Sequence, residues 1–227
     1  MFIDGYHLTP NWPAIRTKNN DDWICHEVAA FGRAHKRMLI SQGVSEGRIF
    51  LVNPPLLSAQ ERYGRRREET DEFDVIVLSW QPLHRNPLAS YSSPRRTLRD
   101  ALITLKSSGY RNIAVKIRWR AERTYVAALC RELDLAIPIL EGPLHTHLHR
   151  TSLFVGGISG AVAQVIGADL RYIIFEPEEN GYSDSMISKS HAISRSSISR
   201  TVDELQNLLL TSATSWLGDY HENLFVK

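Results

Sequence analysis

A glycine-rich turn is the clearest candidate for chemistry in this sequence. An apolar segment ending at Val155 runs into the sequence GGISG, which contains Gly157, Ser159 and Gly160. Backbone N–H groups at such a turn, together with the positive end of a following helix, are suited to hold a phosphate, and the Ser159 hydroxyl is a further donor. The same residues also suit a tight turn of small side chains that lets a helix pack closely, so both interpretations stay open.

Charged side chains follow two other apolar segments. Lys116, Arg118 and Arg120 alternate along the end of one segment, which would give it a basic side for an anionic ligand. The alternative is a solvated strand end. Glu176 and Glu179 follow another segment, where carboxylates either bind hydroxyl groups of a sugar or ribose or simply form an exposed turn.

Two further chemistries are disfavoured by the sequence. His145, His147 and His149 alternate, but alternate histidines share a face only on a strand and no second ligand cluster accompanies them, so we expect no metal. Trp80 and Trp119 stand beside basic residues and could stack on nucleic-acid bases. A formal net charge of +2 does not supply the strongly positive groove that such binding needs, so we predict no nucleic-acid partner.

These candidates need a scaffold of alternating strands and helices. Residues 73–79, FDVIVLS, are a continuous apolar run typical of a parallel strand buried on both faces. The pattern predicts an α/β fold, a Rossmann-like open parallel sheet with helices on both faces. Ligands bind beyond the carboxyl ends of such strands, which adds Ser79 to the candidate residues. The predicted strands are 73–79, 112–117, 136–140, 153–155 and 171–175, and the predicted helices are 94–108, 122–133, 158–166 and one that follows Thr201.

Composition and turn signals divide the chain. Residues 1–57 hold a predicted helix at 27–42 and a strand at 49–52, residues 58–72 are a charged linker, residues 73–200 form the Rossmann-like unit, and residues 201–227 close the chain with a helix. Ser93 is the expected cap of the first helix in the Rossmann-like unit, and Thr201 and Glu204 have the spacing of a capping box. The serine-rich residues 183–199 are expected to form a mobile excursion. The linker arginines, Arg62 and 65–67, are balanced by glutamates, which favours a solvated linker over a nucleic-acid site.

The overall composition excludes several classes of protein. The chain has 227 residues, 43% of them hydrophobic and 23% charged, which is the balance of a soluble globular protein. Its two cysteines, Cys25 and Cys130, offer no disulfide framework. The first residues lack the pattern of a signal peptide, and the most apolar stretch, 152–168, is too short and glycine-rich for a membrane span. We therefore expect a cytoplasmic location, either free or peripheral at the inner membrane.

Two stretches resemble the donor-binding, C-terminal half of GT-B glycosyltransferases that build bacterial surface polysaccharides. They are VKIRWRAERTYVAALCRELDLAIPILEG and LFVGGISGAVAQVIGADLRYIIFEPEENG, and the resemblance extends over residues 73–180. The upstream sequence AFGRAHKRMLISQGVSEGRIFLVNPP resembles the last helix and strand of the N-terminal, acceptor-binding half. The resemblance implies one GT-B half-domain with a remnant of the other, as in a C-terminal fragment, a split-gene product or a truncated enzyme.

The resemblance also implies roles for individual residues. In that family a KxHP-type strand end contacts the donor phosphate or the leaving nucleotide. The motif maps here onto residues 116–119, with Lys116 as the lysine and Arg118 in place of the histidine, while the proline is also missing because residue 119 is Trp119. The serine-containing helix start that holds the donor phosphates corresponds to Ser159 and Gly160, and Gln164 lies one helical turn further on.

Three other positions take roles from the same resemblance. Glu141 and Gly142 occupy the region that meets the nucleotide base. The sequence IDGY near the start resembles an acidic-glycine loop that supplies a general base, which makes Asp4 the candidate catalytic base. An ordinary turn carboxylate is the alternative for Asp4.

The expected activity is metal-independent transfer of a sugar from a nucleotide sugar to a glycan acceptor, with no cofactor. Two other functions stay open. One is a non-catalytic module that binds a nucleotide or a partner chain, where the partner supplies the missing half. The other is a sugar-nucleotide epimerase, which shares this architecture and needs no acceptor. The sequence leaves open which sugar, base and acceptor are used.

Overall fold

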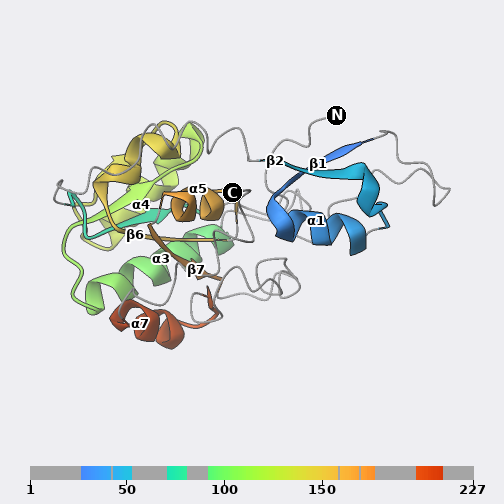
Figure 1. Ribbon diagram of the computed structural model, residues 1–227. Coiled ribbons are helices and arrows are strands. Elements are labelled where there is room, and N and C mark those ends of the chain that lie inside the picture. The colour runs from blue at the N-terminus through green and yellow to red at the C-terminus, as the bar shows by residue number, and fades with distance from the viewer. Residues whose placement is uncertain are drawn as a thin grey trace.

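The chain folds into two separate sheets. The computed structural model describes residues 27–41, 43–52, 71–80, 92–157, 159–168, 170–176 and 198–211. Within these ranges a two-stranded sheet lies near the N-terminus and a six-stranded sheet follows it (Figure 1). Asp4, Glu179 and the arginine-rich linker lie outside the described residues, as does most of the serine-rich stretch.

The N-terminal unit is a short βαβ arrangement. It consists of β1 (Val28–Phe31), α1 (Gly32–Ser41), the 3-10 helix η1 (Glu46–Arg48) and β2 (Ile49–Val52). The strand predicted at 49–52 is confirmed, but the helix predicted over 27–42 is wrong in its first part. Residues 28–31 pair in parallel with β2, with Val28 opposite Ile49, and Gly32 separates strand from helix with a φ of 75°. Sheet pairing has overridden the helical spacing of the apolar residues.

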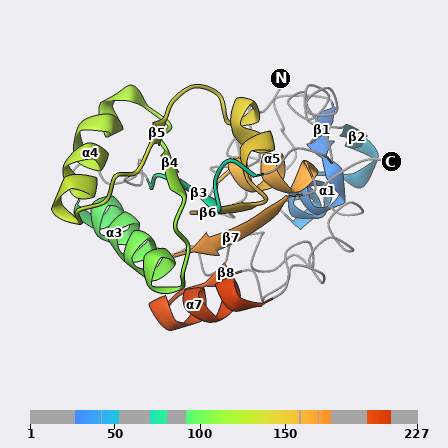
Figure 2. The ribbon, with the colours of Figure 1, turned by 90° about the vertical axis from the view of Figure 1, so that its left-hand side faces the viewer.

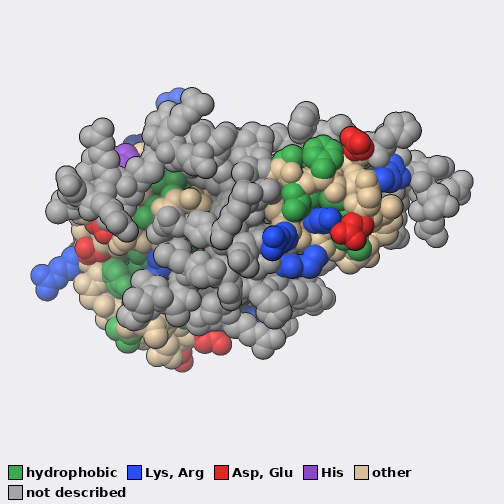
Figure 3. Space-filling model, in the orientation of Figure 1, with side chains coloured by type: hydrophobic (Ala, Val, Ile, Leu, Met, Phe, Trp, Pro, Cys, Tyr) green, Lys and Arg blue, Asp and Glu red, His purple; other side chains and the backbone are tan. Residues whose placement is uncertain are grey.

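The N-terminal unit has a small core of its own and leaves apolar surface outside it. Phe50 follows the core residue Ile49 on β2 and is 47% exposed. Lys and Arg side chains also appear on this unit in Figure 3. The buried core residues are Val28, Ala30, Leu39, Val44 and Ile49.

The six-stranded unit is an all-parallel sheet with the order β5-β4-β3-β6-β7-β8. Figure 2 shows the six strands in this order, with α5 on one side of the sheet and α3, α4 and α7 on the other. This arrangement confirms the predicted open parallel sheet with helices on both faces. Its elements are β3 (Val75–Leu78), α3 (Ser92–Ser107), β4 (Ile113–Lys116), η2 (Arg120–Glu122), α4 (Arg123–Glu132), β5 (Ile139–Leu140), η3 (Leu144–Arg150), β6 (Leu153–Gly156), α5 (Ala161–Gly167), β7 (Arg171–Phe175), β8 (Ile198–Ser199) and α7 (Val202–Leu210).

Alternating strand residues supply two cores, one on each face of the sheet. Val75 and Val77 of β3 join the core formed with α3, α4 and α7. Ile76 of the same strand joins the core formed with α5 and η3. Because successive strand side chains point to opposite faces, a sheet covered on both sides needs apolar residues at every position, which is the run seen in the sequence.

The helix ends agree with the sequence in two cases and differ in two. Thr201 and Glu204 form the predicted capping box, in which the Thr201 side chain accepts from the Glu204 N–H. The first helix of this unit, α3, ends at Ser107, just before Gly109, which has a φ of 92°. However, α3 begins at Ser92, so Ser93 lies inside its first turn and is not the cap. Likewise α5 begins only at Ala161, because the preceding glycines belong to the strand end and turn.

A sixth strand, β8, closes the sheet where the sequence predicted only an excursion. Ile198 lies opposite Ile174 and Ser199 opposite Phe175. The Glu176 N–H also donates to the Ser199 carbonyl at 3.0 Å. Two residues form this strand, too few for a periodic signal in the sequence. No helix among the described residues is both long enough and apolar enough to span a bilayer.

Candidate functional site

The strand order defines where a ligand would bind. The chain proceeds from β3 to β4 and β5 on one side, then crosses back so that β6, β7 and β8 lie on the other side. β3 and β6 are thus the neighbours at which the direction of winding reverses. In doubly wound sheets, ligands bind in the crevice beyond the carboxyl ends of such a pair, which here means beyond Ser79 and Gly157.

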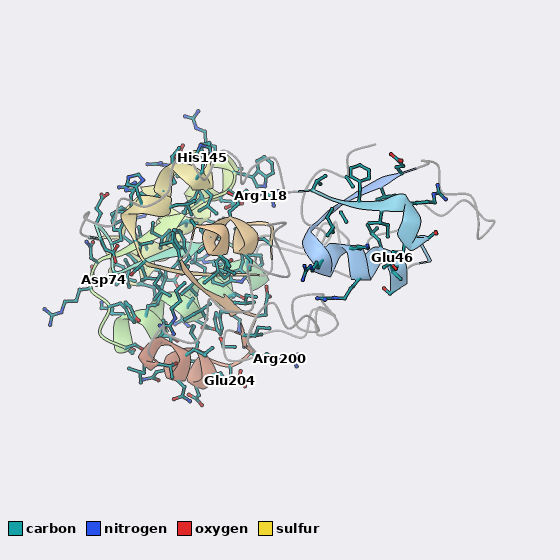
Figure 4. The ribbon with its side chains drawn as sticks, in the orientation of Figure 1. Glu46, Asp74, Arg118, His145, Arg200 and Glu204 are labelled. Atoms are coloured by element: carbon teal, nitrogen blue, oxygen red, sulfur yellow. The ribbon has the colours of Figure 1, made fainter. Side chains whose placement is uncertain are left out.

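The carboxyl ends of the strands face the N-terminal unit. In Figure 4, Asp74 before β3 and Arg118 after β4 lie at opposite ends of the six-stranded unit, and Arg118 is at the end nearer to the N-terminal unit. The candidate residues after the strands are therefore on the side of the six-stranded unit that is nearer to the N-terminal unit in this view.

Gly156, the last residue of β6, and Gly157 after it are packed against protein atoms. A Cβ on Gly156 would lie 2.5 Å from the Tyr172 hydroxyl oxygen and 2.9 Å from Leu78 Cβ. A Cβ on Gly157 would lie 2.7 Å from a Glu176 carboxylate oxygen. Close packing thus accounts for both glycines. Gly160 differs, because nothing lies within 4 Å of a Cβ built there.

Ser159 is held inside the turn by its own hydroxyl group. Its Oγ accepts from the Ala161 N–H at 3.3 Å and lies in hydrogen-bond contact with the Tyr172 hydroxyl. Tyr172 in turn donates to the Gly157 carbonyl at 2.8 Å. Burial raises the pKa of Tyr172 far above its usual value, and the nearby Glu176 carboxylate raises it further, so Tyr172 remains a neutral donor. The helix that follows, α5, has only seven residues, so any phosphate bound here would rely on the N–H groups of the turn more than on a long helix dipole.

Trp80 and Glu176 complete this side of the site. The Trp80 indole N–H donates to the Phe175 carbonyl at 3.0 Å, and its carbonyl accepts from the Tyr125 hydroxyl at 3.2 Å. Trp80 is buried and packs beside Gly157, so it is a structural residue. Glu176 is half-buried next to it. The structure therefore brings together Gly157, Ser159 and Glu176 around one turn.

A second cluster lies at the ends of β3 and β4, and its central residue is Glu122. The Glu122 carboxylate is 2% exposed and accepts from the Ser79 hydroxyl and, at 3.1 Å, from the Arg118 N–H. It links two candidate residues that belong to different strands. Sequence reasoning missed it, although an acidic residue four positions after Arg118 at a helix start was the available signal.

Lys116 is in this cluster but does not extend toward solvent. The strand ends at Lys116, so the predicted alternation of Lys116, Arg118 and Arg120 along a strand is wrong, and only the two arginines are exposed. The Lys116 ammonium is buried and donates to the Ile117 carbonyl. Burial lowers the pKa of Lys116, while the Glu122 carboxylate acts in the opposite direction.

The residues after β5 are joined to η3 and α4. The Glu141 carbonyl contacts His147 Nε2 at 2.7 Å, and its carboxylate pairs with the Arg123 guanidinium. Gly142 adopts a φ of 90°, which glycine accommodates without strain. His147 lies on a 3-10 helix and not on a strand, and no group of three potential metal ligands gathers among the residues that the structure describes.

The candidate residues thus form two clusters on either side of β3. Ser79, Lys116 and Arg118 meet around Glu122, while Gly157, Ser159 and Glu176 meet around the turn after β6. Gln164 is half-buried on α5, with its N–H directed at the Gly160 carbonyl. Because strands lie about 4.8 Å apart, β4 and β6 are separated by about 10 Å, a span that a nucleotide could bridge but one phosphate could not.

Comparison with known proteins identifies the fold. No protein-family model and no curated protein matches the sequence. Among solved structures, the UDP-GlcNAc 2-epimerase of Methanocaldococcus jannaschii, in complex with UDP-GlcNAc and UDP, aligns with a TM-score of 0.62 and 14% identity over 90% of this chain and 58% of its own. The wall teichoic acid polymerase TagF, soaked with CDPG, aligns with a TM-score of 0.55 and 10% identity over 88% of this chain and 51% of its own.

The six-stranded unit is a GT-B half-domain. The alignments cover 88–90% of this chain. The six-stranded unit and the residues after it make up a smaller share than that, so the alignments include the N-terminal unit. The chain spans a little over half the length of these structures. At such low identity the likeness establishes the fold, and the predicted Rossmann-like GT-B half-domain is confirmed.

Proposed function

We propose that this chain binds a nucleotide sugar and takes part in transferring its sugar to a glycan acceptor, such as a bacterial surface polysaccharide. The observation that supports this most is the β3/β6 switch point, which a GT-B half-domain presents toward its other half. The residues proposed for the donor phosphates are Lys116, Arg118, Gly157, Ser159, Gly160 and Gln164; those proposed for the nucleotide and sugar are Ser79, Glu141, Gly142, Glu176 and Glu179; and Asp4 is the proposed base.

The two clusters suit different parts of such a donor. The exposed Arg118 guanidinium and the N–H groups of the turn at Ser159 would stabilise the negative charge that develops on the departing nucleotide. The Glu176 carboxylate would accept from hydroxyl groups of the sugar or ribose. Lys116 would reach a phosphate only if its ammonium left the Ile117 carbonyl.

An epimerase is the second candidate. It is favoured by the higher TM-score of 0.62 with a UDP-GlcNAc 2-epimerase, compared with 0.55 for TagF. An epimerase would use the same nucleotide-sugar site but would release an altered nucleotide sugar without consuming an acceptor.

The chain's partial coverage of these structures supports a further element of the proposal. The chain aligns with 51–58% of their length, so the acceptor-binding half would come from a missing N-terminal half or from a partner chain. The alternative is a module that binds a nucleotide or a partner without turnover. We place this activity in the cytoplasm, free or at the inner membrane surface.

One set of measurements separates these functions. The purified chain is titrated with UDP, CDP and GDP, then incubated with UDP-GlcNAc and followed by proton NMR. Inversion at carbon 2 without acceptor supports the epimerase. Release of UDP only when a glycan acceptor, or a partner polypeptide with it, is added supports transfer. If none of the nucleotides binds, both enzyme functions are refuted.

A further inference from the structure

One aromatic side chain at the candidate site is unusually exposed. Trp119 follows β4 and is 54% exposed, whereas Trp80 after the neighbouring strand is 7% exposed. Single exposed apolar residues are common on proteins and need no function. The surroundings of Trp119 distinguish it from such a residue.

The backbone that carries Trp119 is fixed on both sides. The Arg118 N–H donates to Glu122 at 3.1 Å, and the Glu122 N–H donates to the Trp119 carbonyl at 2.9 Å. The Ile117 N–H is tied to the Leu140 carbonyl of β5 at 3.0 Å. Glu122 itself is buried. The exposed indole is therefore presented by a rigid segment, as pre-organised binding requires.

The indole also has a charged neighbour. The Arg118 guanidinium carbon lies 5.2 Å from the centroid of the Trp119 ring, within the range of a cation–π interaction. This contact restricts the ring while more than half of the side chain stays accessible. It also keeps a positive charge beside whatever stacks on the indole.

The position of this pair matches one end of a nucleotide. β4 is adjacent to β3, so Trp119 lies one strand away from the switch point. The neighbouring strand on its other side, β5, is followed by Glu141 and Gly142, the residues proposed above to meet the base. The turn with Ser159 lies on the far side of β3. A nucleotide that lay across β3 would place its phosphates at the turn and its base beside Trp119.

We propose that Trp119 is the stacking surface for the heterocyclic base of a nucleotide, with Arg118 holding the indole in place. This inference rests on the proposed nucleotide-sugar site and assigns its base end, and it gives Arg118 a role at that end in place of the phosphate contact proposed above. A planar base stacked on an aromatic ring gains affinity that tolerates different bases. A mononucleotide fits better than a nucleic-acid strand, because a strand needs successive aromatic platforms, and the described part of this sheet edge exposes one.

The test compares ligands with and without a base on the full chain. Thermal-shift titrations with UDP, CDP and pyrophosphate are made on wild type, Trp119→Ala, Trp119→Phe and the control Ile103→Ala, which shortens an exposed apolar side chain on α3. We expect Trp119→Ala to weaken UDP and CDP binding about 5- to 150-fold. Trp119→Phe should retain most of the affinity, and pyrophosphate binding should be unchanged in every variant.

The outcomes distinguish failure of the stacking role from failure of the proposed nucleotide-sugar site. Nucleotide binding that survives Trp119→Ala unchanged overturns the stacking role and leaves the nucleotide site standing. Equal losses for UDP and pyrophosphate also overturn it, because the residue would then act on the fold of the site. Tighter binding of an oligonucleotide than of UDP would point to nucleic acid instead. Wild type that binds no nucleotide refutes both proposals together.

Discussion

Replacing Gly156 by alanine should destabilise the six-stranded unit because two fixed groups occupy the space of the new methyl group. The Cβ would meet the Tyr172 hydroxyl at 2.5 Å and Leu78 Cβ at 2.9 Å, well inside ordinary contact distances. Tyr172 is 1% exposed and bonded to the Gly157 carbonyl, and Leu78 Cβ is attached directly to the backbone of β3, so neither group can move aside alone.

The size of the effect follows from these contacts. Overpacking of a core costs about 1–3 kcal/mol, and weakening the Tyr172 hydrogen bond costs about 1 kcal/mol more. The lower entropy of the unfolded alanine chain offsets about 0.5 kcal/mol. The net loss of about 1.5–3.5 kcal/mol in the free energy of unfolding should lower Tm by about 3–14 °C.

The assay is thermal unfolding followed by circular dichroism, with Gly160→Ala as the matched control. Gly160 has a φ of −58° and open space around its Cβ position, so alanine there should be neutral or stabilise by about 0.4–1 kcal/mol. In the double variant with Tyr172→Phe, part of the loss at Gly156 should be recovered because the nearest atom is removed. Equal losses for the two glycine variants, or no recovery in the double variant, would refute the close-packing argument.

Three further predictions concern other residues of the site and its scaffold. Glu122→Ala should lower the free energy of unfolding by about 1–3 kcal/mol in urea titrations, because the partly buried Ser79 hydroxyl loses its acceptor. Glu122→Gln, which keeps one carbonyl oxygen, should lose less, and equal losses would contradict this explanation. Burial lowers the pKa of His147 from its ordinary 6.5. The contribution of neutral His147 to stability should therefore be complete above pH 6.5 and should decline as the pH falls toward the lowered pKa. The fall in Tm from pH 7.5 to 5.5 should be smaller in His147→Asn, and an equal fall in the variant would contradict this explanation. Thr201→Ala should cost about 1 kcal/mol by removing the capping box, measured by urea titration, whereas a neutral result would show that tertiary contacts alone hold α7.

The strands of the six-stranded unit were predictable from sequence because burial on both faces leaves an unbroken apolar run. Residues 75–78, 113–115 and 172–175 are such runs, and each lies in a strand. Two-residue strands such as β8 carry no such signal, since their place is set by pairing with a neighbour distant in sequence. The strand at 28–31 was hidden by helical spacing for the same reason.

The candidate site was predictable in its location more than in its contacts. The rule that ligands bind beyond strand ends selected Ser79, Gly157 and Glu176 from the sequence, and the structure brings the last two together. Whether a charged group faces solvent depends on its neighbours in space. The Lys116 ammonium donates to a backbone carbonyl, and the Glu122 carboxylate lies at the centre of a cluster. The spacing of residues along the sequence predicted neither contact, because both depend on groups from other parts of the fold.

The pairing of β7 with β8 defines a position at which extra residues could be inserted into the chain. The described part of β7 is followed by Glu176, and the described chain resumes at Ile198, which lies directly opposite Ile174. Because β7 and β8 are parallel, Glu176 lies one strand spacing across and two residues along from Ile198, a separation of about 8 Å. Since closing a longer loop costs only a logarithmic increase in entropy, a reporter peptide or an added recognition element could be grafted between these two anchor points without rebuilding either core.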